Sequence, residues 1–145
     1  MMEKIITRSA AETEAAGERL AARLTGGTVL CLSGDLGGGK TTFMKGLARA
    51  CGVATPITSP TFLVEAIYKG KRQKAKVKNV YHFDVYRVKD SAEILALGWE
   101  EVLADPSGLV VVEWAERIKD ILPPRCLWVR FKFIDADTRE IEIGR

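Results

Sequence analysis

Residues 34–41 read G-D-L-G-G-G-K-T, and this stretch decides the fold because it matches the phosphate-binding loop pattern GxxxxGK[ST]. The apolar residues 29–32 precede the loop, and apolar residues at helical spacing follow it. A phosphate-binding loop needs this context, in which a strand turns directly into a helix. The sequence therefore predicts a ligand that carries phosphate groups.

Each residue type in the loop has a physical role in binding an anion. The glycines lack a Cβ atom, so the backbone can adopt positive φ and bring successive N–H groups around a phosphate chain. The anion would lie at a helix N-terminus, where unpaired N–H groups and the helix dipole favour it. Lys40 can reach the β- and γ-phosphates, and the hydroxyl of Thr41 can ligate Mg²⁺. Thr42 either contacts a phosphate or lies in the first helical turn. The predicted nucleotide-binding residues of the loop are Asp35, Leu36, Gly37, Gly38, Gly39, Lys40, Thr41 and Thr42.

The length and composition predict a single domain, residues 1–145, with one hydrophobic core. No segment approaches the roughly 20 apolar residues that a membrane helix needs, and the first residues lack the apolar core of a signal peptide. We therefore expect a cytoplasmic protein that does not enter a membrane. Cys31, Cys51 and Cys126 show no metal-ligand spacing and fall in predicted strands or helices, so we expect buried, reduced thiols.

Positive charge is concentrated in one segment, which we call the basic run (69–78). The net charge is +3, but six of the ten residues that begin with Lys69 and end with Lys78 are basic and none is acidic, which leaves −3 for the rest. Such a segment is typical of a docking surface for an anionic partner, either RNA or an acidic protein. A solvated hairpin tip explains it equally well, because the run contains no aromatic residue that could stack on a base.

Hydrophobic periodicity and turn residues predict alternating strands and helices. Helices are predicted over residues 9–24, 91–97 and 115–122 and from the loop to residue 51, and strands over 28–33, 62–68, 80–88, 109–112, 126–134 and 139–143. The continuously apolar segment 109–112 is typical of a central parallel strand covered on both faces. The alternation predicts an α/β fold, namely a P-loop NTPase-like three-layer sandwich with a mixed, mainly parallel central sheet and a C-terminal β-hairpin.

Two acidic residues at the ends of apolar strands are the candidates for metal binding and hydrolysis. Glu113 follows residues 109–112, and Asp84 ends the run 80–84. Ligands bind at the carboxyl ends of strands in open α/β sheets, and a phosphate loop needs a carboxylate from a second strand to hold Mg²⁺. We assign Thr41 and Glu113 to the metal, Asp84 to the attacking water or a water-mediated metal contact, and Lys40 to the phosphates. Exchanging the roles of the two acids would not contradict the sequence, and either acid could instead be a surface ion-pair partner.

Three neighbouring residues have less specific patterns. His82 shares a strand face with Asp84, but a lone histidine is more often a hydrogen-bonded structural residue than a catalytic one. Strand alternation directs Arg87 away from Asp84 unless the strand has already ended. Trp114 follows Glu113 and could stack on a nucleotide base, although burial is the default for a tryptophan.

Four motifs, in the same order, resemble those of the TsaE (YjeE-type) family, the small ATPase of bacterial tRNA threonylcarbamoyladenosine biosynthesis. They are G-D-L-G-G-G-K-T-T at 34–42, T-S-P-T-F at 58–62, H-F-D-V-Y-R at 82–87 and V-E-W-A-E at 112–116, and they span most of the chain. The family often has alanine where this chain has Gly38, which is a conservative difference. Its basic hairpin is variable, so the resemblance assigns no role to the basic run.

The resemblance implies ATP and Mg²⁺ as cofactors, Glu113 as a metal ligand and Trp114 close to the adenine. It implies two switch segments, 59–62 and 82–87, that respond to the γ-phosphate and the metal. It also implies an ATPase that is weak alone and works with the TsaD and TsaB proteins, which install the threonylcarbamoyl group on tRNA. Hydrolysis would reset that assembly. Whether tRNA also contacts this protein directly, through the basic run, is left open.

Two other functions fit the loop. A small-molecule kinase would use the basic run as a lid, although phosphoryl clamps often use arginine and this run offers mostly lysine. A binding module would use its nucleotide state to regulate docking without useful turnover. The sequence contains no guanine-reading motif of the NKxD type, which disfavours a GTPase, and the choice of ATP over GTP rests on the resemblance.

Overall fold

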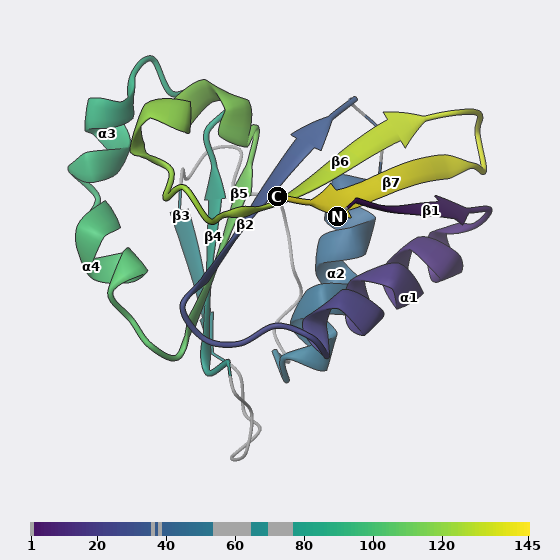
Figure 1. Ribbon diagram of the computed structural model, residues 1–145, viewed down its shortest axis with the longest axis horizontal. Coiled ribbons are helices and arrows are strands. Elements are labelled where there is room, and N and C mark those ends of the chain that lie inside the picture. The colour runs from purple at the N-terminus through teal and green to yellow at the C-terminus, as the bar shows by residue number, and fades with distance from the viewer. Residues whose placement is uncertain (1, 36, 38, 54–64, 70–76) are drawn as a thin grey trace.

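The computed structural model describes residues 2–35, 37, 39–53, 65–69 and 77–145. Leu36 and Gly38 of the loop, the first switch segment (59–62) and most of the basic run lie outside the described residues. The described part contains seven strands, four α-helices and one 3₁₀ helix (Figure 1). In chain order they are β1 (Glu3–Thr7), α1 (Ala10–Ala21), β2 (Thr28–Gly34), α2 (Lys40–Ala50), β3 (Glu65–Lys69), β4 (Asn79–Asp84), α3 (Ser91–Leu95), α4 (Trp99–Leu103), β5 (Gly108–Glu113), η1 (Ala115–Ile121), β6 (Leu127–Phe133) and β7 (Arg139–Gly144).

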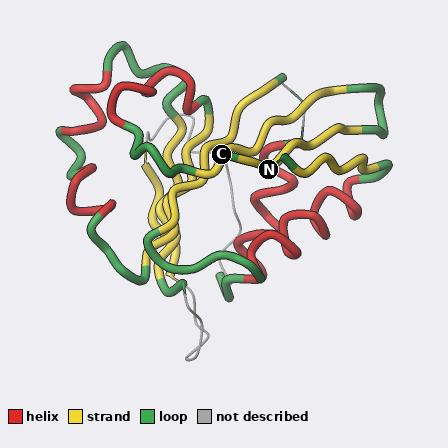
Figure 2. The backbone as a smooth tube through the Cα atoms, in the orientation of Figure 1, coloured by secondary structure: helices red, strands yellow, loops and turns green. Residues whose placement is uncertain are grey.

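The described strands form one sheet in the order β1-β7-β6-β2-β5-β4-β3. The central pairs β6–β2, β2–β5 and β5–β4 are parallel, whereas β7, β1 and β3 join by antiparallel pairs. Because β1 is antiparallel to β7, it runs in the same direction as the four central strands, so the sheet is mainly parallel. The tube in Figure 2 shows the strands as one continuous, strongly twisted sheet. The predicted mixed sheet and C-terminal hairpin are confirmed.

Both faces of the central strands are buried, because alternate side chains enter two different hydrophobic clusters. Leu30 and Leu32 of β2 pack with α1 and α2, whereas Val29 and Cys31 pack with α3, α4 and η1. Every residue of β5 is buried, as its uninterrupted apolar sequence predicts. Figure 1 shows the two groups of helices on opposite sides of the sheet, which completes the three layers.

Helices α1 and α2 cross so closely that a glycine is required at the contact. A Cβ atom added to Gly46 would lie 1.9 Å from the backbone oxygen of Glu14, which is far inside contact distance. Ser9 begins α1 as expected, since its side chain accepts a hydrogen bond from the N–H of Glu12. The two helices therefore form one packed unit under the phosphate loop.

The structure differs from the predicted elements in several places. Strand β4 ends at Asp84 rather than at residue 88, because the Asp84 carboxylate accepts a hydrogen bond from the N–H of Tyr86 and begins a turn. The predicted helix 9–24 ends at Ala21, and the predicted helix 115–122 is a 3₁₀ helix. Strand β1 and helix α4 were not predicted, since both are only five residues long and β1 lies at the sheet edge.

Candidate active site

The phosphate loop leaves the central strand β2 and enters α2, as predicted. At its start, Gly34 has φ 118°, and an added Cβ would lie 2.0 Å from the backbone oxygen of Phe131 on β6. Only glycine fits this position. At the other end, Gly39 is the N-cap of α2, so no side chain at that position covers the first N–H groups of the helix. Those groups are the ones that a phosphate-binding loop offers to an anion.

Lys40 begins α2 and is buried. Its Nζ donates hydrogen bonds to the backbone oxygens of Gly34 (2.8 Å) and Asp35 (3.2 Å), within the loop itself. Burial lowers the pKa of the Lys40 ammonium, and the negative charges of Glu113, Glu116, Asp35 and Asp84 oppose that shift. The ammonium therefore lies in a buried position where a bound anion would stabilise its charge.

The two predicted carboxylates lie on adjacent strands, at the carboxyl ends of both. Asp84 ends β4, Glu113 ends β5, and the parallel register pairs the two residues directly. The register between β2 and β5 pairs Glu113 with Leu32, two residues before the loop begins. Both acids are buried, with exposed fractions of 8% and 4%. Predicted residues that are far apart in sequence are thus brought together beside Lys40.

His82 is the direct partner of Glu113. Its Nε2 lies 2.6 Å from Oε2 of Glu113, and both side chains are buried. The other ring nitrogen, Nδ1, has no hydrogen-bond partner among the described residues. An N–H at Nε2 suits this contact, because the carboxylate oxygen of Glu113 accepts a hydrogen bond. His82 thereby fixes the orientation of the Glu113 carboxylate.

Trp114 covers the ammonium of Lys40. Its ring centroid is 4.2 Å from Nζ, and Tyr86 packs against its ring at a centroid distance of 4.8 Å. Trp114 is also the only non-glycine residue with positive φ (61°) among the described residues, a backbone conformation that tryptophan rarely adopts. The backbone turn after Glu113 thus directs this aromatic ring towards the Lys40 ammonium. Its predicted contact with adenine stays a prediction.

The C-terminal hairpin braces the other side of the loop. The N–H of Phe133 donates to Oδ2 of Asp35 at 3.2 Å, and Nε of Arg139 donates to the backbone oxygen of Gly37 at 2.9 Å. The guanidinium of Arg139 lies 4.6 Å from the ring centroid of Phe133. The loop is therefore held between the carboxylates of β4 and β5 on one side and the hairpin β6–β7 on the other.

The donor set fits Mg²⁺ only together with a nucleotide. Within the described part of the chain, no cluster of three or more histidine, cysteine, aspartate or glutamate side chains could hold a metal alone. The predicted donors, the hydroxyl of Thr41 and the carboxylates of Glu113 and Asp84, are all oxygens, which Mg²⁺ prefers. Phosphate oxygens and water complete the coordination of this ion on a phosphate loop. The residues are thus suited to a metal that arrives with its nucleotide.

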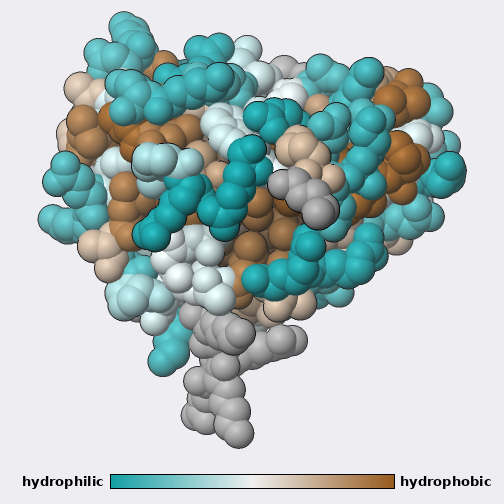
Figure 3. Space-filling model, in the orientation of Figure 1, coloured by the Kyte–Doolittle hydropathy of each residue, from teal (hydrophilic) through white to brown (hydrophobic). Residues whose placement is uncertain are grey.

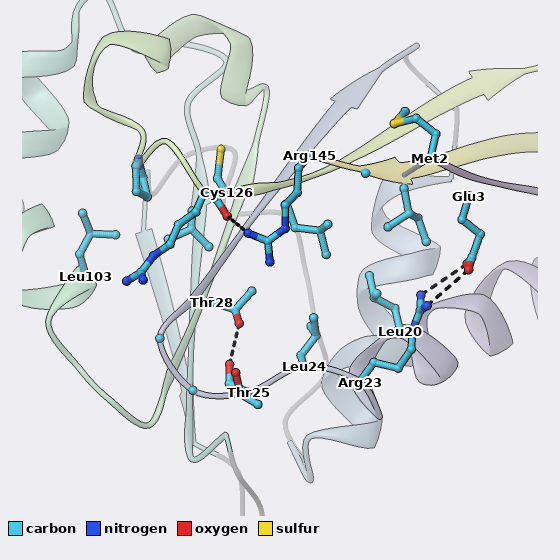
Figure 4. A pocket seen from close by; sticks show the side chains of 18 residues that line it. Met2, Glu3, Leu20, Arg23, Leu24, Thr25, Thr28, Leu103, Cys126 and Arg145 are labelled. Carbon is cyan, nitrogen blue, oxygen red and sulfur yellow. Dashed lines mark hydrogen bonds and ion pairs between the residues drawn. The ribbon is translucent and has the colours of Figure 1, made fainter.

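A cavity of about 720 Å³ lies at the opposite end of the parallel strands (Figure 4). It is lined by Thr28, where β2 begins, and by Arg23, Arg125 and Arg145. Arg23 forms an ion pair with Glu3 at 3.3 Å, and Arg145 donates to the backbone oxygen of Arg125 at 3.1 Å. Figure 3 shows hydrophobic side chains near the middle of this face, bordered by hydrophilic ones. None of the predicted site residues lines the cavity.

The parallel core, the glycine-rich turn after β2 and the lysine at the start of α2 define the class of P-loop NTPase-like α/β domains. A family model described as "Threonylcarbamoyl adenosine biosynthesis protein TsaE" matches residues 7–141. The chain belongs to the TsaE family. Helices long and apolar enough to cross a membrane are absent from the described residues.

Individual relatives agree with this assignment. The protein of Rickettsia prowazekii (strain Madrid E) named "tRNA threonylcarbamoyladenosine biosynthesis protein TsaE" is 39% identical over 135 residues, covering 92% of this chain and 89% of its own. The protein of the same name from Treponema pallidum (strain Nichols) is 34% identical over 141 residues, covering 97% and 99% of the two chains. The crystal structure of Bacillus subtilis YdiB matches with a TM-score of 0.73 at 34% identity, covering 99% of this chain and 84% of the other.

The predicted site residues that the structure describes lie in the loop or beside it. Asp35, Gly37 and Gly39 lie in the loop, and Thr41 and Thr42 lie in the first turn of α2. Several contacts were not predicted, among them that of His82 with Glu113, that of Tyr86 with Trp114, and that of Arg139 with Gly37. The shared strand face of His82 and Asp84 was the only sequence signal for the first. Arg139 lies 102 residues from Gly37, and no local pattern indicates such a contact.

Proposed function

We propose that this protein binds and hydrolyses ATP in a Mg²⁺-dependent reaction that supports threonylcarbamoyladenosine modification of tRNA. Membership of the TsaE family and the names of the relatives support the pathway. The observation that carries the chemistry is the position of Lys40, whose buried ammonium lies at the mouth of the loop under the influence of Glu113 and Asp84. Phosphoryl transfer needs this combination of a cationic phosphate ligand and nearby carboxylates.

Each residue has a role that follows from its chemistry. The backbone N–H groups at the start of α2 and the Lys40 ammonium bind the phosphates, which requires Lys40 to leave its loop carbonyls. Thr41 and Glu113 would hold Mg²⁺, which supplies charge stabilisation at the phosphate oxygens. Asp84 orients the attacking water; its Oδ1 accepts the N–H of Tyr86, which fixes its side chain. His82 keeps Glu113 in place.

The proposed partners are the TsaD and TsaB proteins. In this proposal ATP hydrolysis is weak without these partners, and the protein works in the cytoplasm. Contact between tRNA and the basic run is a further part of the proposal; of this run the structure describes Lys69 at the end of β3 and residues 77 and 78. Lysine-to-glutamate changes in the run should weaken association with tRNA in low salt and spare basal turnover. Association that stays unchanged across a salt titration would remove this contact from the proposal.

The experiment that tests the function measures phosphate released from ATP by the protein alone and with TsaD, TsaB and tRNA. We expect slow, Mg²⁺-dependent release of free phosphate, accelerated in the complete mixture. Phosphate transferred to a small acceptor instead of water would show a kinase. Saturable ATP binding without turnover in any mixture would show a nucleotide-gated binding module.

A further inference from the structure

The cavity at the opposite end of the sheet has no part in the proposed function. Its volume of about 720 Å³ is in the range of sites that bind small molecules, and none of the predicted site residues lines it. Strand β2 runs from Thr28 at the cavity to Gly34 at the phosphate loop, a distance of about 20 Å at the rise of an extended strand. A molecule in this cavity would therefore be separate from the nucleotide.

Positive charge predominates on the side chains that line the cavity. They include three arginines and one acid, Glu3, which leaves a side-chain charge of +2. Glu3 is already paired with Arg23, whose two Nη atoms lie 3.3 and 3.4 Å from its carboxylate oxygens. Arg125 and Arg145 form no ion pair with any residue that the structure describes. Figure 4 shows the side chain of Arg145 directed into the cavity. Two guanidinium groups are therefore available to an anion.

The floor of the cavity is apolar. The hydrophobic lining residues that are less than a tenth exposed are Leu20, Leu24, Val29, Cys126 and Ile143. A bare inorganic anion would meet the arginines and leave this floor in water, whereas a ligand with an apolar body would remove the floor from water. We propose that the cavity binds a small organic anion in which a carboxylate or phosphate head group is joined to an apolar body. Arg125 and Arg145 bind the head group, and the floor receives the body.

The wall of the cavity between α1 and β2 is held in place by the turn before β5. The N–H of Gly27 donates to the backbone oxygen of Gly108 at 2.7 Å. A Cβ added to Gly26 would lie 2.0 Å from the backbone oxygen of Pro106, so the two segments are in direct contact. This close approach leaves the wall little freedom to move. The cavity therefore exists before a ligand arrives, and the ligand has little ordering to impose on the chain.

Guanidinium groups suit the proposed head group. Carboxylates and phosphates accept paired hydrogen bonds from a guanidinium fork. Nη1 of Arg145 donates to the backbone oxygen of Arg125 at 3.1 Å, which anchors the Arg145 guanidinium at the cavity. Both arginines are exposed, so water screens their charge and the head group alone would bind weakly. Ligands that have only the head group or only the apolar body should therefore bind poorly.

The test titrates the isotope-labelled full chain with octanoate and with octyl phosphate, each below its micelle concentration. Amide chemical shifts report both the place and the affinity of binding. We expect saturable shifts at Thr28 and Cys126, which line the cavity, and the anion that binds more tightly identifies the head group. Acetate, which lacks the apolar body, and octanol, which lacks the charge, should bind at least about tenfold more weakly.

Three substitutions test the role of the arginines. Arg125→Gln and Arg145→Gln should each weaken binding of the octyl anion by about fivefold and leave octanol binding unchanged. Arg19→Gln is the matched control, because Arg19 is an exposed arginine on α1 outside the cavity and loses the same charge. Its affinity for the anion should change by less than about twofold. Thermal unfolding checks that each variant is folded.

The outcomes separate this inference from the proposed function, on which it does not rest. Shifts that are absent from the lining amides with both anions, or octanol that binds as tightly as the anions, would overturn the inference. So would an equal loss of affinity in Arg19→Gln, since it would indicate a general attraction of charge. A chain that binds an octyl anion here but never hydrolyses ATP would overturn the proposed function alone.

Discussion

At the scale of single residues, the site is built from buried polar groups that hold one another in place. Lys40, His82, Asp84 and Glu113 are all less than a tenth exposed. Polar groups are costly to bury without partners, so each must be hydrogen-bonded or close to an opposite charge. Such an arrangement is rigid before any ligand arrives, which is the property that electrostatic catalysis requires.

Lys40→Ala and Asp84→Ala should separate binding from hydrolysis. Lys40→Ala removes the ammonium that, in the proposed function, binds the phosphates, so ATP affinity should fall by more than about tenfold. Asp84→Ala leaves the loop intact and should bind ATP nearly normally while single-turnover hydrolysis slows by about a hundredfold. Equilibrium binding and rapid-quench measurements distinguish the two effects. Normal turnover in Asp84→Ala would refute its role in positioning water.

The His82–Glu113 contact can be tested by two substitutions of similar size. His82→Met removes the donor at Nε2 and should lower the free energy of unfolding by about 2 kcal/mol, because a hydrogen bond to a buried carboxylate is lost. His82→Gln places an amide donor near the same position and should lose less than about 1 kcal/mol. Urea denaturation measures both. Equal losses in the two variants would mean that packing, rather than the hydrogen bond, accounts for the effect.

At the scale of elements, the sequence predicts those helices, strands and turns that depend on patterns of neighbouring residues. The strand–loop–helix unit, the buried strand β5 and the C-terminal hairpin could be predicted because their signals lie within a few residues. The end of β4 was predicted four residues too late, because no local sequence pattern shows that the Asp84 carboxylate accepts a hydrogen bond from the N–H of Tyr86 and begins a turn. The bracing of the loop by Arg139 depends on a contact between distant segments, which no single-sequence pattern contains.

The crossing of α1 and α2 makes a prediction for Gly46. In an open helix, Gly46→Ala would add up to about 1 kcal/mol of stability through helix propensity. Here the new methyl group would meet the backbone of Glu14 at 1.9 Å, so we expect a net loss of about 1–3 kcal/mol. Gly27→Ala is the comparison, since its Cβ would have nothing within 4 Å and only its φ of 85° is unfavourable. A stabilised Gly46→Ala variant in urea denaturation would show that the helices can separate at no cost.

At the scale of the whole molecule, stability in acid should depend on Asp105. Hydrogen bonds from Tyr81, then Asn79 and the N–H of Ser107, lower the pKa of Asp105 below its ordinary value of 3.8. The unfolded chain therefore binds this proton more readily than the folded one. The resulting stability is present above pH 3.8 and is lost as the pH falls from there through the lowered folded pKa. The contacts also join the start of β4 to the turn before β5.

Asp105→Asn isolates this effect. Its free energy of unfolding should be lower than that of the wild-type chain near neutral pH, and the difference should shrink as the pH falls to about 3. Urea denaturation of both proteins at a series of pH values measures the difference, in which the other carboxylates cancel. A difference that stays constant over this range would show that Asp105 contributes through packing rather than through its charge.

The self-contacts of Lys40 impose a threshold on any ligand. Because the ammonium already has two oxygen partners from Gly34 and Asp35, an incoming anion must outcompete the chain's own carbonyls before it gains the lysine. A singly charged ion such as chloride offers little in exchange, whereas a polyphosphate offers several oxygens and more charge at once. The phosphate loop would therefore bind abundant singly charged anions weakly and bind multiply charged anions preferentially.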